Sequence, residues 1–352
     1  MGANRSMRLG IIARSDKTGL GNQTYELTKM LNPDKVLLIN SFYFNKNEQF
    51  PKLYRGYNVT ESSRGFITDE EARNFLDGLD AVLSCETFYN GNFINIAKKM
   101  GVKTLLQYNF EFLDNLRDPS FPVPDVFIAP SMWNFDVVLN SFGKKARVVH
   151  LPPPTSLEKF ASARKSNITD KPHNKILHIA GKIADADRNG TNTVMEMLKH
   201  STADYELVIK VQNPQKLESP PADSRLRIDS SNPDNSADLY VGFDAMVLPR
   251  RYAGLCLPMN EALLSGLPVF MTDISPNNFV LPKEWLVGSK QISKIKTRTI
   301  LPVYAADPIA LAAMVDNFVS NQNRENQKAF DLGKELFSPE SLKDKYLSLI
   351  SE

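Results

Sequence analysis

The chain has 352 residues, roughly twice the usual length of one domain, so the length favours two domains over a single small module. Hydrophobic residues make up 42% and charged residues 23%, which is typical of a core-forming protein, and no apolar run reaches the ~18 residues that a membrane span needs. The net charge of +2 excludes a strongly basic nucleic-acid-binding chain, although a local basic groove stays open.

The cysteine content indicates a reducing location. The two cysteines, Cys85 and Cys256, lie far apart without CxxC spacing, and no signal-peptide pattern precedes the first apolar stretch. We therefore expect no disulfide framework and a cytoplasmic protein.

Short, β-rich apolar runs alternate with longer helical patterns along the chain, which predicts βαβ units and parallel sheets. The runs are continuous rather than alternating, as expected for strands that are buried on both faces. The predicted strands cover 9–13, 36–39, 81–85, 104–107, 126–129 and 147–150, then 176–180, 205–211, 226–228, 245–248 and 268–271.

These patterns predict an α/β protein with two doubly wound parallel sheets. Three consecutive prolines and a polar, aperiodic stretch between the two sets of strands mark a linker. Near the end of the chain, apolar residues at helical spacings are broken by Pro339, which predicts two closing helices. The predicted ranges are 7–152 for the first domain, 153–174 for the linker, 175–322 for the second domain and 323–352 for helices that pack back across the hinge.

A glycine loop, Gly19-Leu20-Gly21, joins the first predicted strand to a helix, where backbone N–H groups can approach a ligand. A nicotinamide fingerprint would need a third glycine where Thr24 stands and an acidic residue after the second strand, where Asn40 stands. Dinucleotide binding is therefore disfavoured. The alternative is a tight turn in which the glycines serve only the backbone geometry.

The most specific stretch covers 248–269 and predicts a strand, a glycine loop, a helix and another strand. Pro258 suits a first helical turn and Gly266 suits a helix end, so the helix begins at the carboxyl edge of the sheet, where such folds bind ligands. The free N–H groups of this first turn favour an anion.

This stretch is similar to the EGFGLPxLEAMACGLPV signature of retaining GT-B glycosyltransferases of family four, also called glycosyl transferases group 1. Other segments match the family in the same order along the chain: 130–131 with 152–154, 178–182, 188–191 and 239–240. The resemblance therefore covers nearly the whole chain. It implies the GT-B fold, with two facing Rossmann-like domains that hold the acceptor in the first and the donor in the second. It also implies sugar transfer across the cleft between them, and a phage or bacterial enzyme.

The resemblance implies a nucleotide-diphosphate sugar as co-substrate, with a UDP-sugar as the expected donor. Glu261 matches the second glutamate of the family's E-x7-E motif, which holds the donor ribose, whereas Ala253 stands in place of the first glutamate. The identity of the sugar therefore does not follow from the motif. The other donor contacts expected in this loop are Arg250, Arg251, Gly254, Leu255, Cys256 and Leu257.

Basic residues after the strands of the second domain match the family's diphosphate clamp in part. Lys182 lies where the family commonly has an arginine, and Arg188 lies beside the place of the paired lysine. Breaking the bond to a nucleoside diphosphate builds negative charge on the phosphates, which cations stabilise most in the transition state. We expect Lys182 and Arg188 to be catalytic, and Asn189 and Lys210 to contact the donor. The alternative for the two cations is solvated loop charge.

The candidate acceptor residues follow the predicted strands of the first domain. Glu86 and Glu111 are the candidate groups for positioning or deprotonating an acceptor hydroxyl, with a structural role as the equal alternative. Tyr89, Tyr108 and Asn109 are the expected acceptor contacts. The histidine that many family members carry near the second loop is absent, so retention of configuration is implied by the resemblance alone.

No metal site is expected. Asp185-Ala186-Asp187 matches a DxD metal motif, but its place in the second sheet favours coincidence, and the sequence has no HExxH, Cys/His cluster, GxSxG or P-loop.

The acceptor stays open among small sugars, lipids, proteins and hydroxymethylated DNA bases, and we expect no integral membrane association. Two rival functions are a nucleotide-sugar epimerase and a nonenzymatic nucleotide-sugar-binding protein.

Overall fold

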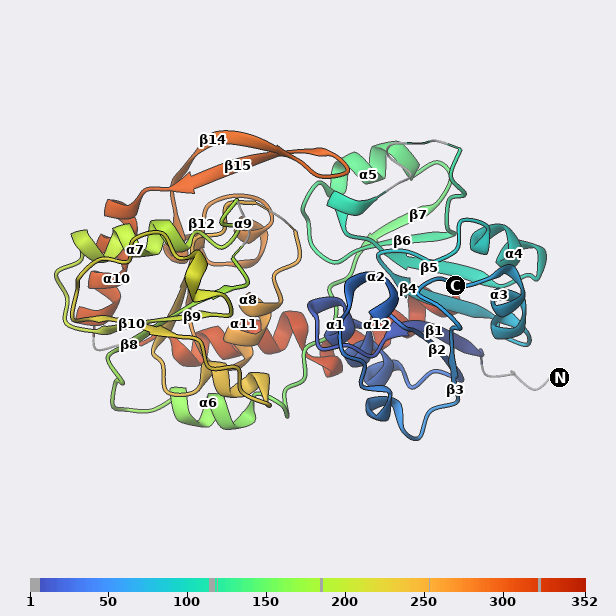
Figure 1. Ribbon diagram of the computed structural model, residues 1–352, viewed down its shortest axis with the longest axis horizontal. Coiled ribbons are helices and arrows are strands. Elements are labelled where there is room, and N and C mark those ends of the chain that lie inside the picture. The colour runs from blue at the N-terminus through green and yellow to red at the C-terminus, as the bar shows by residue number, and fades with distance from the viewer. Residues whose placement is uncertain (1–6, 114–117, 119, 184–185, 253, 322–323) are drawn as a thin grey trace. The chain divides into compact units, whose positions relative to one another are not determined.

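The computed structural model describes residues 7–113, 118, 120–183, 186–252, 254–321 and 324–352. The chain forms two compact units (Figure 1). Unit 1 comprises Met1–Thr155 together with Pro339–Glu352, and unit 2 comprises Ser156–Ser338.

Unit 1 is built on a seven-stranded parallel sheet in the order β3-β2-β1-β4-β5-β6-β7. Its strands are β1 (Leu9–Arg14), β2 (Lys35–Ile39), β3 (Val59–Glu61), β4 (Ala81–Cys85), β5 (Lys103–Gln107), β6 (Val126–Ala129) and β7 (Arg147–His150). Its helices are α1 (Gly19–Leu31), α2 (Phe42–Asn45), α3 (Asp69–Leu76), α4 (Phe93–Lys99), α5 (Phe135–Phe142) and α12 (Pro339–Ser351), with 3-10 turns at Pro51–Tyr54 and Phe110–Phe112.

Helices cover both faces of this sheet because alternate strand residues point to opposite sides. Ile11, Leu38 and Leu83 pack on the face covered by α1 and α12. Ile12 and Leu37 pack on the opposite face, which α3, α4 and α5 cover. The two faces thus have separate hydrophobic cores, which accounts for the continuous apolar runs of the strands.

A buried polar network ties the last helix to the rest of unit 1. Gln107, at the end of β5, donates from Nε2 to the Tyr346 hydroxyl at 2.8 Å and to the Leu151 carbonyl at 3.0 Å. Its Oε1 accepts from Gln23 Nε2 at 2.6 Å. The Tyr346 hydroxyl in turn lies 3.0 Å from the Pro152 carbonyl oxygen. The network therefore joins α1, β5, the chain after β7 and α12.

Unit 2 contains a six-stranded parallel sheet in the order β10-β9-β8-β11-β12-β13. Its strands are β8 (Lys175–Gly181), β9 (Glu206–Val211), β10 (Leu226–Asp229), β11 (Ala245–Leu248), β12 (Val269–Thr272) and β13 (Leu286–Val287). Its helices are α6 (Ala161–Asn167), α7 (Thr191–His200), α8 (Leu257–Leu264), α9 (Asn277–Val280), α10 (Pro308–Ser320) and α11 (Asn326–Phe337), with 3-10 turns at Pro214–Lys216, Ser236–Tyr240 and Lys283–Trp285.

The sequence predictions of two doubly wound parallel sheets and of a helix break at Pro339 are confirmed. All eleven predicted strands are present, whereas β3, β13 and a separate antiparallel hairpin, β14 (Ser289–Lys296) with β15 (Ile300–Ala306), were not predicted. These three elements lack the continuous apolar run of a buried parallel strand, because they are short or exposed.

The boundary between the units differs from the predicted linker. The range 153–174 contains α6, and unit 2 begins at Ser156. Asn167 of α6 is buried and donates from Nδ2 to the carbonyls of Tyr240 and Ser265, so this polar residue ties α6 to unit 2.

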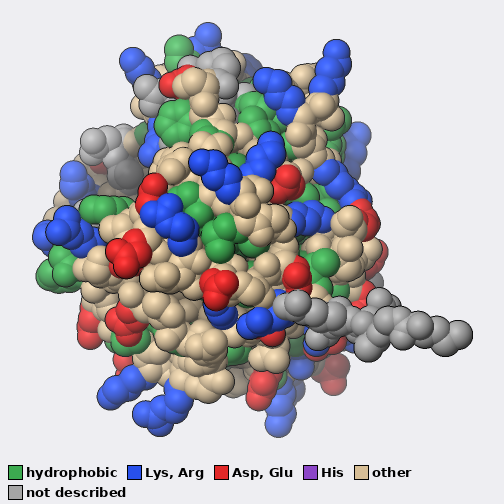
Figure 2. Space-filling view, turned by 90° about the vertical axis from the view of Figure 1, so that its right-hand side faces the viewer, with side chains coloured by type: hydrophobic (Ala, Val, Ile, Leu, Met, Phe, Trp, Pro, Cys, Tyr) green, Lys and Arg blue, Asp and Glu red, His purple; other side chains and the backbone are tan. Residues whose placement is uncertain are grey.

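Charged side chains of both signs are interspersed over the face of the molecule in Figure 2, in keeping with the small net charge. Among the described residues, no helix has the length and apolar character needed to cross a bilayer.

We predict that Tyr346→Phe lowers the free energy of unfolding by about 1 to 3 kcal/mol, because it leaves the buried carbonyl of Pro152 without its donor. Urea unfolding followed by tryptophan fluorescence and circular dichroism measures the change. Tyr43→Phe is the matched control, since Tyr43 is 58% exposed, and we expect a change within about 0.5 kcal/mol. Equal stability of wild type and Tyr346→Phe would contradict the role given to the network.

Candidate functional site

The sheet of unit 2 has its topological switch point between β8 and β11. The chain runs from β8 to β9 on one side, and β11 pairs with β8 on the other side. The loops that follow the two strands diverge at such a point and leave a crevice at the carboxyl edge, where open α/β sheets bind ligands. Of the predicted residues, Lys182, Arg188 and Asn189 follow β8, and Arg250, Arg251, Gly254, Leu255 and Cys256 follow β11. Leu257 is the first residue of α8.

The two loops are in direct contact at Gly190, the residue before α7. Gly190 has φ +72°, and a Cβ atom there would lie 2.3 Å from the carbonyl oxygen of Pro249. Only glycine satisfies both the left-handed conformation and this approach. The sequence segment Arg188-Asn189-Gly190 is therefore fixed against the start of the β11–α8 loop.

Arg251 clamps the same two loops together. Its backbone N–H donates to the Arg188 carbonyl at 2.9 Å, and its Nη1 donates to the Ala186 carbonyl at 3.0 Å. The guanidinium of Arg188 in turn lies 5.3 Å from the ring centroid of Tyr252. Arg251, predicted as a donor contact, thus binds backbone carbonyls and positions the exposed Arg188.

Arg250 is buried beneath the loop that precedes α8. It is 5% exposed, and its Nη1 donates to the Leu255 carbonyl at 3.0 Å, which ties the end of β11 to the residues just before α8. Its Nε–H has no hydrogen-bond acceptor among the described residues. A buried cationic donor without an acceptor is costly, and an oxyanion satisfies it well.

Helix α8 begins beside this arginine without a side-chain cap. Cys256 occupies the N-cap position and offers no side-chain acceptor to the first turn, and Pro258 lies in that turn, as predicted. The N-terminus of α8 therefore carries the partial positive charge of an uncapped helix.

Two further polar groups near this edge lack partners among the described residues. Asn260, in α8, is 1% exposed and its Nδ2 has no acceptor, while Thr272, at the end of β12, is buried with an unpartnered Oγ1. Sequence reasoning missed both, because an Asn within a helix and a Thr at a strand end carry no distinctive spacing.

Glu261, the predicted ribose ligand, is held by a tyrosine. Its Oε2 accepts from the Tyr240 hydroxyl at 2.5 Å. Burial and the neighbouring Glu261 charge raise the pKa of Tyr240 well above its ordinary value, so Tyr240 stays a neutral donor. The tyrosine fixes the orientation of the carboxylate. From the sequence, Leu239-Tyr240 stood out only as a segment that matches the family's order.

The other predicted donor residues fall into two groups. Lys182 is exposed directly after β8, in the same loop as Arg188, so the structure brings both cations to one edge. Asn189 donates from Nδ2 to the carbonyls of Ile179 and Ala180, and Lys210 forms an ion pair with Asp229 at 2.5 Å. Asn189 and Lys210 are thus engaged within the protein, and their contact with a donor stays a prediction.

His178 supports both loops from below and was given no role from the sequence. It is fully buried on β8, with Nδ1 2.8 Å from the Val247 carbonyl oxygen and Nε2 3.0 Å from Thr191 Oγ1. The carbonyl requires the proton on Nδ1, so Nε2 accepts from the hydroxyl. Burial lowers the pKa of His178, although the hydrogen bond to Val247 and the charge of Asp187 oppose the shift.

Asp187 caps α7 rather than completing a metal motif. Its two carboxylate oxygens accept from the backbone N–H groups of Thr191 and Asn192, each at 2.9 Å. Asp185 and Ala253 lie outside the described residues. Among the residues that are described, no three His, Cys, Asp or Glu side chains gather as a metal site requires.

In unit 1, the glycine loop before α1 packs against a buried aspartate. A Cβ on Gly21 would lie 1.9 Å from the Asp16 carbonyl oxygen, so the close backbone approach alone requires this glycine. Asp16 binds Arg14 at 2.6 Å and accepts from the hydroxyls of Thr18 and Ser41. Burial raises the pKa of Asp16, but these hydrogen bonds and the Arg14 charge outweigh it and lower the pKa. The geometry gives Gly21 a backbone role, while donor contacts of Gly19, Leu20 and Gly21 stay a prediction.

A cavity of about 270 Å³ opens where β4 and β5 end in unit 1. The predicted acceptor residues Glu86 and Tyr89 line it together with Phe112 and Phe121, which sequence reasoning missed. Glu86 and Tyr89 have φ of +68° and +57°, a conformation that is strained in residues other than glycine and that clusters at functional sites. Asn109 Nδ2 donates to Glu86 Oε1 at 2.9 Å and so orients the carboxylate.

Three predicted acceptor residues, Tyr108, Asn109 and Glu111, do not line this cavity. Tyr108 is 1% exposed and packs edge-on against Phe127 at 5.9 Å, within the core beneath α4 and α5. Glu111 is 8% exposed on the short turn Phe110–Phe112. Side chains of consecutive residues in an extended chain point to opposite sides, so Tyr108 and Asn109, which follow β5, point away from each other.

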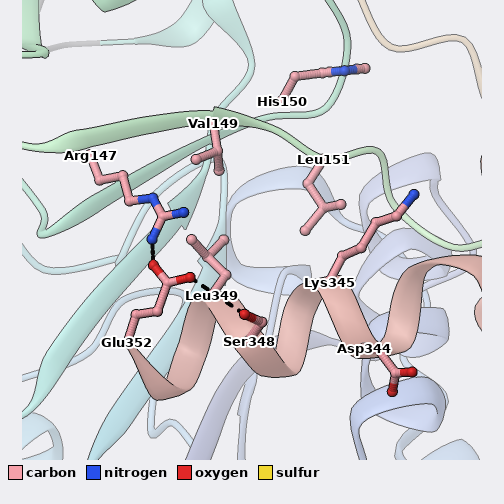
Figure 3. Close-up of a pocket in the computed structure, with 9 residues that line it drawn as sticks. All are labelled: Arg147, Val149, His150, Leu151, Asp344, Lys345, Ser348, Leu349 and Glu352. Atoms are coloured by element: carbon pink, nitrogen blue, oxygen red, sulfur yellow. Dashed lines mark hydrogen bonds and ion pairs between the residues drawn. The ribbon is translucent and has the colours of Figure 1, made fainter.

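A second cavity in unit 1, of about 450 Å³, lies between β7 and α12 (Figure 3). Arg147 pairs with Glu352 across it, and Leu151 and Leu349 line it. None of the candidate site residues predicted from the sequence lines this cavity.

Solved structures with the same fold cover nearly the whole chain. The Anabaena protein HepE in complex with UDP is 10% identical with a TM-score of 0.70, over 98% of this chain and all of HepE. A sucrose-phosphate synthase from Thermosynechococcus elongatus is 14% identical with a TM-score of 0.62, over 98% of both chains. The lipopolysaccharide outer core galactosyltransferase WaaB is 12% identical with a TM-score of 0.67, over 98% of this chain and 99% of WaaB.

These similarities confirm the GT-B fold expected from the sequence. No protein-family model matches the chain, and no curated protein matches it in sequence.

We predict that His178 makes the folding stability depend on pH. Because its pKa is lower in the folded state, the unfolded chain binds the additional proton, and stability falls as the pH drops below about 6.5, by up to ~1.4 kcal/mol per pH unit. Urea unfolding at several pH values between about 5 and 8 measures this slope.

The variant His178→Leu tests whether the slope comes from this residue. We expect it to be less stable than wild type at neutral pH but to have a flatter stability profile. His200→Leu is the control, because His200 lies exposed beside Glu196. An unchanged pH slope in His178→Leu would show that another group titrates.

Proposed function

We propose that this protein is a nucleotide-sugar-dependent glycosyltransferase that moves a sugar from a UDP-sugar to an acceptor hydroxyl. The donor binds at the carboxyl edge of unit 2 and the acceptor at the carboxyl edge of unit 1. The GT-B fold supports this proposal, as do the structures of HepE in complex with UDP and with UDP-glucose.

One observation carries the proposal: unit 2 gathers uncompensated positive charge at its topological switch point. Arg250 has a buried Nε–H without an acceptor in the described part of the chain, α8 begins without a side-chain cap, and Arg188 and Lys182 lie exposed on the neighbouring loop. A bound anion satisfies all of these groups at once. We propose that the two phosphates of the donor lie between the helix N-terminus and the loop cations.

The cations assist the departure of the nucleoside diphosphate. As the glycosidic bond to the donor breaks, its electron pair moves onto the leaving phosphate oxygen, where Lys182 and Arg188 stabilise the growing charge. Arg251 holds Arg188 in place through the Arg188 carbonyl, so it acts as a positioning residue. We propose that this electrostatic assistance replaces a metal ion.

The neighbouring carboxylate of Glu261 binds the donor ribose. The Tyr240 hydroxyl donates to one of its oxygens and holds the carboxylate in place, and a carboxylate oxygen accepts readily from a ribose hydroxyl. Leu255, Cys256 and Leu257 present the backbone N–H groups of the loop and of the first turn to the diphosphate.

The cavity of unit 1 receives the acceptor. Phe112 and Phe121 offer apolar surface, and Glu86 offers a carboxylate that Asn109 orients. We propose that Glu86 positions the acceptor hydroxyl and takes up its proton while the acceptor oxygen bonds to the sugar carbon that the diphosphate leaves, with the configuration at that carbon retained. A glycan or a hydroxymethylated DNA base provides such a hydroxyl. Two unpaired, buried cysteines fit a cytoplasmic enzyme.

Ligand-induced stabilisation tests the nucleotide preference. We predict that UDP and UDP-sugars raise the melting temperature more than the corresponding adenosine and guanosine compounds do. A ligand at 100 times its dissociation constant adds about 2.7 kcal/mol to the stability. The panel is measured by differential scanning fluorimetry without an acceptor, and the absence of a shift with any nucleoside diphosphate would refute the donor site.

Substitution of the exposed cations tests their contact with the diphosphate. We predict that Lys182→Ala and Arg188→Ala each weaken UDP binding about 10- to 100-fold, since a hydrogen bond to a charged group contributes ~1.5 to 3 kcal/mol. Isothermal titration calorimetry measures the change. Arg227→Ala, on β10, is the matched control because Arg227 is exposed and pairs only with Glu206 and Asp229 among the described residues. Wild-type affinity in both test variants would remove these residues from the site.

A further inference from the structure

The hairpin β14–β15 of unit 2, here named the basic arm (residues 289–306), has no part in the proposed sugar transfer. It forms a two-stranded antiparallel sheet of its own, separate from the six-stranded parallel sheet (Figure 1). Its tip is the tight turn Thr297–Thr299, closed by a hydrogen bond from the Thr297 backbone N–H to the Thr299 carbonyl at 2.8 Å.

The basic arm concentrates positive charge. It carries four cations and no acidic residue: Lys290, Lys294, Lys296 and Arg298. The whole chain has a net charge of +2, so the rest of the sequence is net negative. All four side chains are exposed. No acidic group among the described residues lies within ion-pair distance of the three lysines.

The strand register places two of the lysines on one outward face. Leu301 and Val303 of β15 are each 1% exposed, so they define the inner face of the arm. Lys294 and Lys296 are paired with Pro302 and Ile300, which point to the opposite side because strand residues alternate. The exposed face thus combines cations with the 66% exposed Ile300.

The base of the arm is fixed to the candidate donor loop. The Tyr304 backbone N–H donates to the Arg251 carbonyl at 2.9 Å, and Arg251 Nε donates to the Tyr304 carbonyl at 3.3 Å. The same arginine binds the carbonyls of Ala186 and Arg188. A partner held by the arm therefore lies in a defined position relative to the loops of unit 2.

We propose that the basic arm binds duplex nucleic acid, with its lysines on the phosphate backbone. A two-stranded ribbon has the width that the major groove of DNA admits. Gln291 and Ser293, both exposed between the lysines, add amide and hydroxyl groups of the kind that bind phosphates and base edges. Ile300 supplies an apolar side chain of the type that contacts a thymine methyl group or enters a base step.

The composition of the arm favours a nucleic acid over an anionic membrane. A bilayer surface selects Trp and Tyr as interfacial anchors, but the arm has no Trp, and its one Tyr is fixed at the base by Arg251. Polar residues occupy positions on the strand where a membrane anchor would place apolar ones. The binding is independent of sugar transfer, so its test uses no donor.

The experiment measures binding of the full chain to a short fluorescein-labelled DNA duplex by fluorescence anisotropy, from about 50 to 200 mM KCl. The test variant is Lys290→Gln/Lys294→Gln/Lys296→Gln. The matched control is Lys52→Gln/Lys98→Gln/Lys99→Gln, which removes the same charge from exposed lysines of unit 1. Unchanged melting temperatures show that both variants fold.

We expect wild type and control to bind with the same steep salt dependence. In the arm variant, the slope of log K against log salt falls by about 2 to 3, since each lost phosphate contact removes ~0.9, and the affinity at low salt falls at least tenfold. Wild-type affinity and slope in the arm variant would overturn the proposal. So would arm-dependent sedimentation with phosphatidylglycerol vesicles in the absence of DNA binding, because it would assign the arm to a membrane. The DNA-binding measurement uses no UDP. A protein that fails to bind UDP would therefore contradict the proposed donor site without changing the outcome for the basic arm.

Discussion

Parallel pairing of the strands is the constraint on which both candidate sites depend. In each of the two large sheets every strand runs in the same direction as its neighbours, so all strands end at one edge, and the loops that carry polar side chains meet there. The central strands, such as β1, β4 and β11, are buried on both faces and consist mainly of apolar residues. The polar side chains of both candidate sites therefore lie in the loops. The loops of unit 2 contain Arg250, whose Nε has no acceptor among the described residues, and those of unit 1 contain the strained Glu86.

The residues that hold the donor-side loops of unit 2 in place are not the residues expected to bind the donor. Gly190 lets the β8–α7 loop approach Pro249. Arg251, in the β11–α8 loop, donates to a carbonyl of the β8–α7 loop, and His178 joins β8 to β11 from within the core. None of these three needs to touch a ligand. They fix the backbone so that Arg188 and the first turn of α8 are already in place before an anion binds, which reduces the entropy lost on binding.

The sequence predicted the fold well because a buried parallel strand leaves a continuous apolar run, and eleven such runs were strands. It predicted the location of the loops at the carboxyl edge for the same reason. It could not distinguish residues that face a ligand from those that hold the loop, since Arg250 and Arg251 are adjacent and identical in type. Tyr108 and Asn109 were grouped because they are adjacent polar residues after one strand, yet Tyr108 lies in the core and Asn109 orients Glu86. Tertiary hydrogen bonds make these distinctions, and they leave no pattern in spacing.

Net charge conceals how charge is distributed along this chain. A value of +2 argues against a nucleic-acid-binding protein only if the charges are spread evenly, and here four cations lie within the eighteen residues of the basic arm without an acid among them. The field at such a site is set by the charges within about 8 to 10 Å, because salt screens the more distant ones. The net negative remainder of the chain therefore weakens the attraction of the arm for phosphates very little, but it discourages binding of nucleic acid elsewhere. A local cluster on a net-neutral surface directs a polyanion to one place, and the contact between Tyr304 and Arg251 puts that place beside the loops of unit 2.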